Sequence, residues 1–158
     1  MKYQSIPELA DLAVGETTPE KFEGWLNEGR VYLVEEDHMP LGLLATSVRD
    51  GMVYINEIAV HAESQGQGIG ALLLAAAFEW AEGMFEAGEI ESARVSLTTY
   101  TEGVSWNAPW YRKHGFKEVE ADTVGRWHIY KMKYDKEERT LDRPGFRRCC
   151  MLWDSSER

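Results

Sequence analysis

The chain has 158 residues, with 17 basic and 27 acidic side chains and a formal net charge of −10. This length fits one ordinary domain with a real core, and the 44% hydrophobic content excludes a disordered acidic tail. No run approaches the 18 apolar residues of a membrane span. The excess of acidic residues argues against binding of nucleic acid. It suits cationic partners such as amines, or simply serves solubility.

The first 30 residues are expected to be helical, and Met1–Leu9 lacks the basic and apolar regions of a secretory signal, so we expect no leader. Thr18-Pro19 predicts a helix start, because Thr is a good N-cap and Pro suits the first helical position. Phe22, Trp25 and Leu26 follow at helical spacing, and Gly29 ends the pattern.

An antiparallel meander is expected next, with strands at Val31–Glu35, Leu41–Arg49 and Met52–Val60. Asp50-Gly51 predicts a tight hairpin turn, which requires positive φ at both central positions. A helix over Gly70–Glu86 and a strand over Ala93–Tyr100 then predict a parallel strand pair with a right-handed crossover.

Four further elements are expected in the remaining chain: a short helix, a strand, a helix carrying Trp127, Tyr130, Tyr134 and Leu141, and a last strand. The short helix is expected at 107–114, and the two strands at 116–120 and 147–153. The order predicts an α/β or α+β fold with one central mixed sheet.

The two cysteines, Cys149 and Cys150, are adjacent in the sequence. Neighbouring residues rarely meet disulfide geometry, so we expect reduced thiols and a cytoplasmic location. Both lie in the apolar run of the last strand, which favours packing over a nucleophilic role. No spacing resembles a metal site.

The most informative segment is Gln65–Ala71, which lies between a strand and a helix and has glycine at every second position from 66 to 70. Consecutive amides at a helix start bind anions, so a phosphate or pyrophosphate is the expected ligand. The spacing of Gly66, Gly68 and Ala71 also fits a dinucleotide fingerprint, but the turn begins five residues after its strand. The next strand, which ends at Thr99-Tyr100, offers no acidic ribose partner until Glu102. No Walker lysine follows, and a plain glycine-rich connector is the remaining alternative.

Ile58–His61 followed by Gln65–Leu73 resembles the acetyl-CoA-binding motif of the GNAT superfamily of N-acetyltransferases. Trp106–Phe116 resembles a later helix of that family, and the similarity covers about residues 31–120. The resemblance implies one N-acetyltransferase domain over residues 1–158, a mixed α/β fold with helices on both faces of the sheet, and an initial strand that is missing or very short. It also implies pairing into a homodimer through the last strands.

By this resemblance, acetyl passes from acetyl-CoA directly to a primary amine of a small molecule or peptide. The alternative is a non-catalytic CoA-binding or regulatory module on the same fold. The pantetheine arm would lie along Ile58, Ala59 and Val60, with Asn107 helping to hold it. The residues around the pyrophosphate would be Gln65, Gly66, Gln67, Gly68, Gly70 and Ala71.

Tyr111 would protonate the departing thiolate, since a phenol of pKa about 10 matches a thiol of pKa about 8.5. Glu57 is the first candidate for the base that deprotonates the amine, because a carboxylate in an apolar stretch is partly desolvated; a surface glutamate is the alternative. His61 is a second candidate for this base, but it follows the strand near the phosphate turn, so a structural role is expected. Trp106, Trp110 and Trp127 would line the acceptor pocket or pack in the core.

The segment between Arg49 and Arg94 contains no lysine or arginine, and Gln65 stands where Arg is also common in the family motif. The anion must then be held almost entirely by backbone amides, or by distant basic residues such as Arg112 and Lys113. We therefore expect CoA affinity to be moderate and sensitive to salt.

Overall fold

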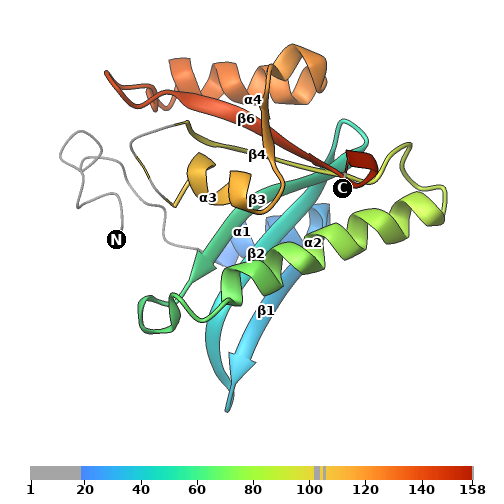
Figure 1. Ribbon diagram of the computed structural model, residues 1–158, viewed down its shortest axis with the longest axis vertical. Helices are drawn as coiled ribbons and strands as arrows, with labels where there is room; N and C mark the ends of the chain where they lie inside the picture. The colour runs from blue at the N-terminus through green and yellow to red at the C-terminus, as the bar shows by residue number, and fades with distance from the viewer. Residues whose placement is uncertain (1–18, 102–103, 105, 158) are drawn as a thin grey trace. The chain divides into compact units, whose positions relative to one another are not determined.

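The computed structural model describes residues 19–101, 104 and 106–157, so the helical interpretation of the first 18 residues lies outside the described part. The elements follow the order α1 (Pro19–Glu28), β1 (Val31–Glu36), β2 (Met39–Arg49), β3 (Met52–Val60), α2 (Ile69–Glu86), β4 (Arg94–Tyr100), α3 (Ala108–Lys113), β5 (Lys117–Val119), α4 (Arg126–Glu137) and β6 (Arg148–Asp154), as Figure 1 shows. The strands form a six-stranded mixed sheet in the order β1-β2-β3-β4-β6-β5. The predicted mixed α/β fold is confirmed.

The chain forms two compact units, and each is described by itself below. The amino-terminal unit comprises Glu20–Leu97 and the end of the chain from Leu152, and the carboxy-terminal unit comprises Thr98–Met151. Strands β4 and β6 contribute residues to both units. The single-domain organisation stays a prediction.

The meander of the amino-terminal unit is built by two tight turns. Asp50 and Gly51 have φ of 51° and 72°, which confirms the predicted hairpin. Asp37 and His38 form a second such turn, with φ of 50° and 66°. Because this turn is so short, β2 begins at Met39, two residues earlier than the sequence predicts.

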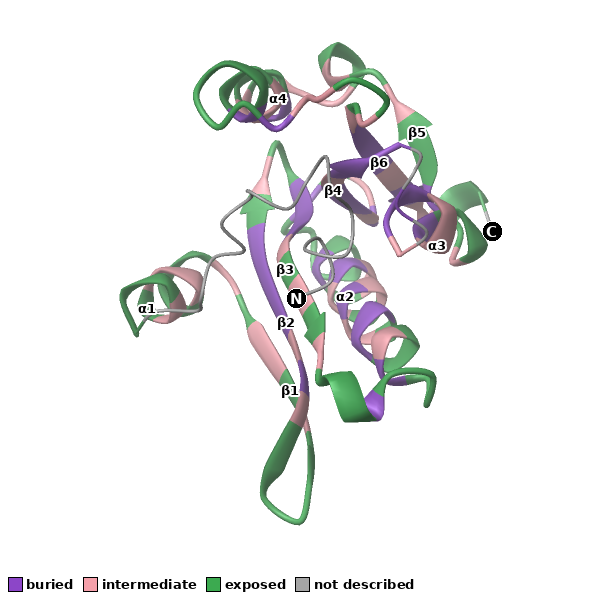
Figure 2. Ribbon diagram, turned by 90° about the vertical axis from the view of Figure 1, so that its left-hand side faces the viewer, coloured by how far each residue is buried: buried purple, intermediate pink, exposed green. Residues whose placement is uncertain are grey.

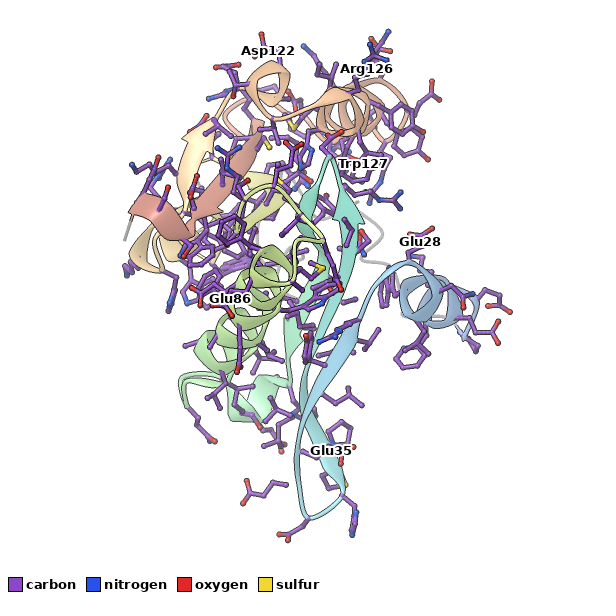
Figure 3. The ribbon with its side chains drawn as sticks, turned by 90° about the vertical axis from the view of Figure 1, so that its right-hand side faces the viewer. Glu28, Glu35, Glu86, Asp122, Arg126 and Trp127 are labelled. Carbon is purple, nitrogen blue, oxygen red and sulfur yellow. The ribbon has the colours of Figure 1, made fainter. Side chains whose placement is uncertain are left out.

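Helix α2 connects two parallel strands, β3 and β4, which pair at Val53 with Val95 and at Tyr54 with Ser96. Figures 2 and 3 show α1 and α2 on opposite sides of β1, β2 and β3, as predicted for this part of the sheet. The helix approaches β2 closely at Gly42, where a Cβ would lie 2.8 Å from Cγ2 of Ile69. Its apolar face is buried at Ile69, Leu73, Leu74, Ala77, Ala81 and Met84.

The carboxy-terminal unit has its own core of Tyr100, Val104 and Leu141, on which Trp106 and Phe146 pack. The Tyr100 hydroxyl donates a hydrogen bond of 2.8 Å to the Leu141 carbonyl oxygen. Leu141 lies beyond the end of α4, so its predicted place in that helix is wrong. The chain turns at Thr140, whose φ is 48°, and this turn returns Leu141 to the core.

Helix α4 buries His128 and Asp135, whereas Tyr130 and Tyr134, which suggested the helix, are 58% and 40% exposed. Strand β5 is three residues long, shorter than predicted. Within the described residues, no helix combines the length and the apolar character needed to cross a bilayer.

Candidate active site

The segment between β3 and α2 starts with a short 3₁₀ turn at Ala62–Ser64. His61 precedes this turn, and its Nδ1 accepts a hydrogen bond of 3.2 Å from the backbone N–H of Glu63. This contact supports the structural role expected for His61, which stays a prediction. Gln65 follows, with its Nε2 only 3.5 Å from the Val60 carbonyl oxygen, so its side chain is weakly held.

Gly66 and Gly68 adopt φ of 82° and 79°, a left-handed conformation that costs other residues energy. A Cβ at either position would meet no atom within 4 Å. The glycines are thus needed for the path of the backbone and leave open space above it. Gly68 is also the N-cap of α2.

Among the residues that the structure describes, none accepts a hydrogen bond from the backbone N–H groups of Gly66 through Ala71. The first bond of this helix end runs from Leu72 N–H to the Gly68 carbonyl oxygen, at 3.1 Å. Gly66, Gln67, Gly68 and Ala71 are exposed, as the exposed stretch in Figure 2 indicates. A row of open amides, most of them on exposed residues, thus lies at the positive end of an 18-residue helix dipole.

The charges of α2 favour an anion at this end. Its first turn contains no acidic residue, and its carboxylates, at Glu79, Glu82 and Glu86, occupy the later half. A carboxylate in the first turn would stabilise the free helix but repel an anion. The turn can therefore bind a phosphate or pyrophosphate through backbone groups alone.

The end of β3 supplies the other predicted contacts of the cofactor arm. Ile58 and Val60 are half-buried, and Ala59 is exposed. Glu57 is exposed too, because the pleat of the strand turns this side chain outward, and its role as the base stays a prediction. Asn56 is the extra residue of a bulge, since Thr46 pairs with Ile55 and Ala45 with Glu57.

Asn107 and Tyr111 meet in the carboxy-terminal unit, at the start and middle of α3. Both are 6% exposed, and Tyr111 N–H donates to the Asn107 carbonyl oxygen at 3.1 Å. The Tyr111 ring packs edge-on against Trp110 and Phe116, with centroids 5.0 and 5.5 Å away. The Tyr111 ring is thus held by its aromatic neighbours, and its backbone N–H by Asn107.

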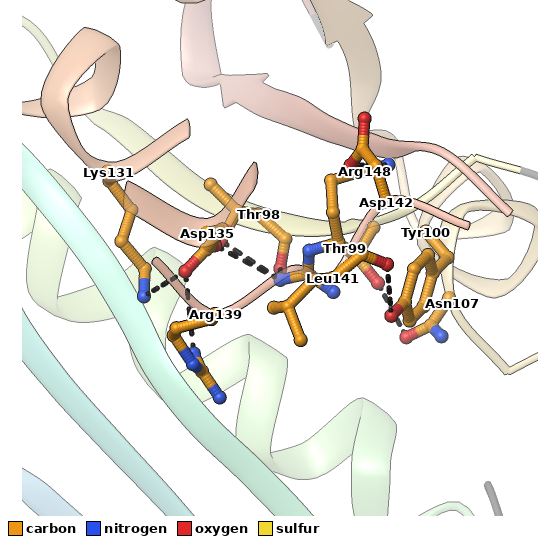
Figure 4. Close-up of polar contacts among 10 residues, drawn as sticks. All are labelled: Thr98, Thr99, Tyr100, Asn107, Lys131, Asp135, Arg139, Leu141, Asp142 and Arg148. Atoms are coloured by element: carbon orange, nitrogen blue, oxygen red, sulfur yellow. Dashed lines mark hydrogen bonds and ion pairs between the residues drawn. The ribbon is translucent and has the colours of Figure 1, made fainter. Parts of the chain in front are cut away.

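Asn107 occupies the N-cap position of α3, but its side chain does not cap the helix. Its Oδ1 instead accepts a hydrogen bond of 2.5 Å from Oγ1 of Thr99, on β4 (Figure 4). The role of Thr99 could not be predicted, because nothing in the sequence pairs a strand threonine with a helix asparagine eight residues later.

The three tryptophans considered for the acceptor pocket are all half-buried. Trp106 packs on the core of Tyr100, Val104 and Leu141. Trp110 contacts the His114 ring at 4.5 Å, and Trp127 contacts the His128 ring at 5.3 Å. Each therefore has packing partners within its own unit, and a place in the acceptor pocket stays a prediction.

A buried charge cluster surrounds Asp135, which is 0% exposed (Figure 4). Its carboxylate lies 2.9 Å from Lys131 Nζ, 3.4 Å from Arg139 Nη1 and 3.6 Å from Arg148 Nη2. Burial lowers the pKa of Lys131, although the hydrogen bond and charge of Asp135 act to raise it. The helical spacing of 131, 135 and 139 could have indicated the first two pairs, but no local pattern indicates Arg148.

Cys149 and Cys150 are buried thiols without a disulfide. Burial and the nearby Glu118 carboxylate raise the pKa of Cys149 to about 12, so this thiol stays protonated at neutral pH. This agrees with a packing role and not a nucleophilic one. Within the described residues, no group of three or more His, Cys, Asp or Glu side chains is arranged to hold a metal ion.

The family described as the acetyltransferase (GNAT) domain matches residues 27–118, which is more than half of the chain. The chain belongs to this GNAT acetyltransferase family. The match includes the glycine turn, Asn107 and Tyr111, and it confirms the resemblance found in the sequence.

Solved structures of GNAT fold resemble this chain along most of its length. An IAA acetyltransferase from Bacillus cereus is 21% identical, with a TM-score of 0.62, and the match covers 98% of this chain and 95% of that one. A GNAT family acetyltransferase from Elizabethkingia anophelis with acetyl-CoA bound is 19% identical, with a TM-score of 0.62 and coverage of 87% and 83%.

N-acetylglutamate synthase from Neisseria gonorrhoeae, in complex with coenzyme A and N-acetyl-glutamate, is 21% identical, with a TM-score of 0.61. The match covers 88% of this chain but only 28% of that protein. The chain thus spans little more than a quarter of the length of this larger relative.

Proposed function

We propose that this chain is an N-acetyltransferase that moves acetyl from acetyl-CoA directly to a primary amine. The observation that carries the proposal is the row of open amides from Gly66 to Ala71 at the start of α2. A diphosphate matches these amides in charge and in its need for several donors. Family membership supports acetyl-CoA as the diphosphate-bearing acetyl donor.

The donor is held in three places. Its diphosphate binds at Gln65–Ala71, its pantetheine arm runs along the backbone of Ile58, Ala59 and Val60, and Asn107 helps to hold that arm. The half-buried edge at Ile58 and Val60 and the buried amide of Asn107 support these assignments.

The chemistry is a direct acyl transfer. The neutral amine nitrogen forms a bond to the thioester carbonyl carbon, the C–S bond breaks, and Tyr111 gives its proton to the departing thiolate. A backbone amide near Ile58 stabilises the oxyanion that forms on the way. Glu57 takes the proton from the amine, and its exposure leaves it open to solvent for returning that proton.

The acceptor is a primary amine of a small molecule or a peptide. The net charge of −10 favours an acceptor that arrives as a cation, and no nucleic acid or membrane takes part. Cys149 and Cys150 are buried and form no disulfide, which supports a reducing compartment such as the cytoplasm. A homodimer that pairs through the last strands remains part of the proposal.

A non-catalytic CoA-binding module is the alternative, and no observation in the described residues favours it. A panel of amines incubated with acetyl-CoA and analysed by mass shift separates the two. We expect a gain of one acetyl group on at least one amine, with matching release of the CoA thiol. Binding of CoA without transfer to any amine would support the alternative.

Tyr111→Phe sharpens this test, because the variant keeps the ring packing against Trp110 and Phe116 and loses only the hydroxyl. Turnover should fall by about 10²- to 10⁴-fold, the usual contribution of a general acid, while CoA affinity changes little. CoA affinity measured by titration calorimetry should also fall with added salt, since surface binding of an anion is screened.

A further inference from the structure

Two adjacent threonines at the end of β4 make hydrogen bonds on opposite sides of the strand. Thr98 accepts hydrogen bonds from Arg148 Nη2 at its carbonyl oxygen and at Oγ1, at 3.2 and 3.3 Å. Thr99 points the other way, as alternate strand residues do, and its hydroxyl donates to Asn107 Oδ1. Figure 4 shows both contacts.

The end of β4 is held rigidly on the Arg148 side. The guanidinium of Arg148 also lies 4.8 Å from the centre of the Tyr100 ring and 3.6 Å from Asp135. Its side chain is only 12% exposed. The backbone that carries the Thr99 hydroxyl is therefore fixed by a buried cation, and this hydroxyl has a well-defined position.

Asn107 would otherwise have a different use for its side chain. Asparagine is one of the preferred N-cap residues, because its oxygen can accept the N–H of the second or third helical residue. In α3 the second helical residue is Pro109, which has no N–H, so only Trp110 remains as a donor. The Thr99 hydroxyl thus competes with a single backbone donor for the Asn107 side-chain oxygen. In the structure this oxygen accepts the hydrogen bond from Thr99.

We propose that Thr99 is a positioning residue of the transfer reaction, whose hydroxyl keeps the Asn107 amide off the helix cap and oriented to hold the acetyl-CoA arm. This inference rests on the proposed function. Without the hydroxyl, the Asn107 oxygen moves to the Trp110 N–H, and the amide is withdrawn from the cofactor.

The test uses Thr99→Val, which keeps the shape and removes the hydroxyl, with Thr98→Val as the matched control one residue away. Thr99→Val should raise KM for acetyl-CoA about tenfold, the typical effect of losing one oriented hydrogen bond, with kcat nearly unchanged. Thr99→Ser keeps a hydroxyl and should restore the KM. Thr98→Val should lower thermal stability through Arg148 and leave KM near that of the wild type.

A readout without turnover uses the three asparagines of the chain, Asn27, Asn56 and Asn107. Protein labelled with ¹⁵N-asparagine gives three side-chain amide pairs, and Asn107→Ala identifies the relevant one. We expect Thr99→Val to shift the Asn107 pair, Thr98→Val to leave it in place, and CoA to shift it in the wild type.

The inference is overturned, with the proposed function intact, if the wild type acetylates an amine while Thr99→Val matches it in KM and in the Asn107 resonances. An equal rise of KM in Thr98→Val would also overturn it, since the effect would then be structural. A wild type that neither binds CoA nor transfers acetyl refutes the proposed function itself.

Discussion

The glycine turn at 65–71 and the charge cluster around Asp135 solve opposite electrostatic problems. The turn offers open backbone amides, contains no cation and is mostly exposed to solvent. The cluster directs three cations, Lys131, Arg139 and Arg148, at one fully buried carboxylate. The backbone is thus available for a ligand in one region, while side-chain charge is used internally in the other.

This difference shows where charge is useful in each case. A buried carboxylate is costly unless cations and hydrogen bonds compensate for lost hydration, so the cluster needs side chains brought from α4 and β6 together. An exposed anion site needs only fixed dipoles, which a positive-φ glycine path and a helix start provide locally. The first arrangement supports the fold, and the second is left open for binding.

The largest effect is expected from Asp135→Asn, which removes the charge that the three cations share. Breaking a buried ion pair from one side costs about 3–5 kcal/mol of unfolding free energy, because Lys131 and Arg148, which are largely buried, lose their partner. Urea unfolding measures this loss. Asp122→Asn, at an exposed position, is the control and should change stability by less than about 0.5 kcal/mol. A loss below 1 kcal/mol in Asp135→Asn would mean that the cluster contributes little.

Ala71→Asp tests the turn, since it places a carboxylate in the first turn of α2. It should stabilise the free protein by a few tenths of a kcal/mol through the helix dipole, and weaken CoA binding about tenfold by repulsion. Ala75→Asp, one turn further along the same helix and also exposed, should weaken binding much less. Thermal unfolding and titration calorimetry give the two quantities. Tighter CoA binding in Ala71→Asp would contradict an anion at this position.

A smaller effect is expected for the peripheral pair of Arg94 and Asp154, whose atoms are 2.9 Å apart. Burial acts to raise the pKa of Asp154, but hydrogen bonds from Ser156 and the charge of Arg94 outweigh it and lower the pKa. A lowered pKa stabilises the fold above the ordinary carboxyl pKa, and this contribution disappears as the pH falls through the lowered value.

Asp154→Asn should therefore cost about 1 kcal/mol or less at pH 7, and the difference from the wild type should shrink towards pH 3. Unfolding curves at both pH values check this. A difference that grows at low pH would reverse the sign and contradict the account of this pair.

The turns and the βαβ order could be predicted because their causes are local. Asp50-Gly51 sits between alternating strands, and the sequence places Gly66 and Gly68 where the backbone needs positive φ. The buried face of α4 could not be predicted in this way. Its aromatic residues Tyr130 and Tyr134 point outward, because Asp135 is turned inward by its ion pair with Arg148 from another element.

The candidate site shows the same limit. The residues of the glycine turn were indicated by their own sequence, whereas the orientation of Asn107 depends on Thr99, and the exposure of Glu57 depends on the pleat of β3. The residue types indicated the chemistry of the site. Tertiary contacts determine which of these side chains have a defined orientation.

The most direct test of the central claim follows the glycine amides in protein labelled with ¹⁵N-glycine while CoA is added. If the diphosphate binds to the open amides of the turn, the N–H resonances of Gly66, Gly68 and Gly70 shift with CoA and stay in place with pantetheine, which has no diphosphate. Saturating CoA that shifts other glycines but leaves these three unchanged would contradict the account.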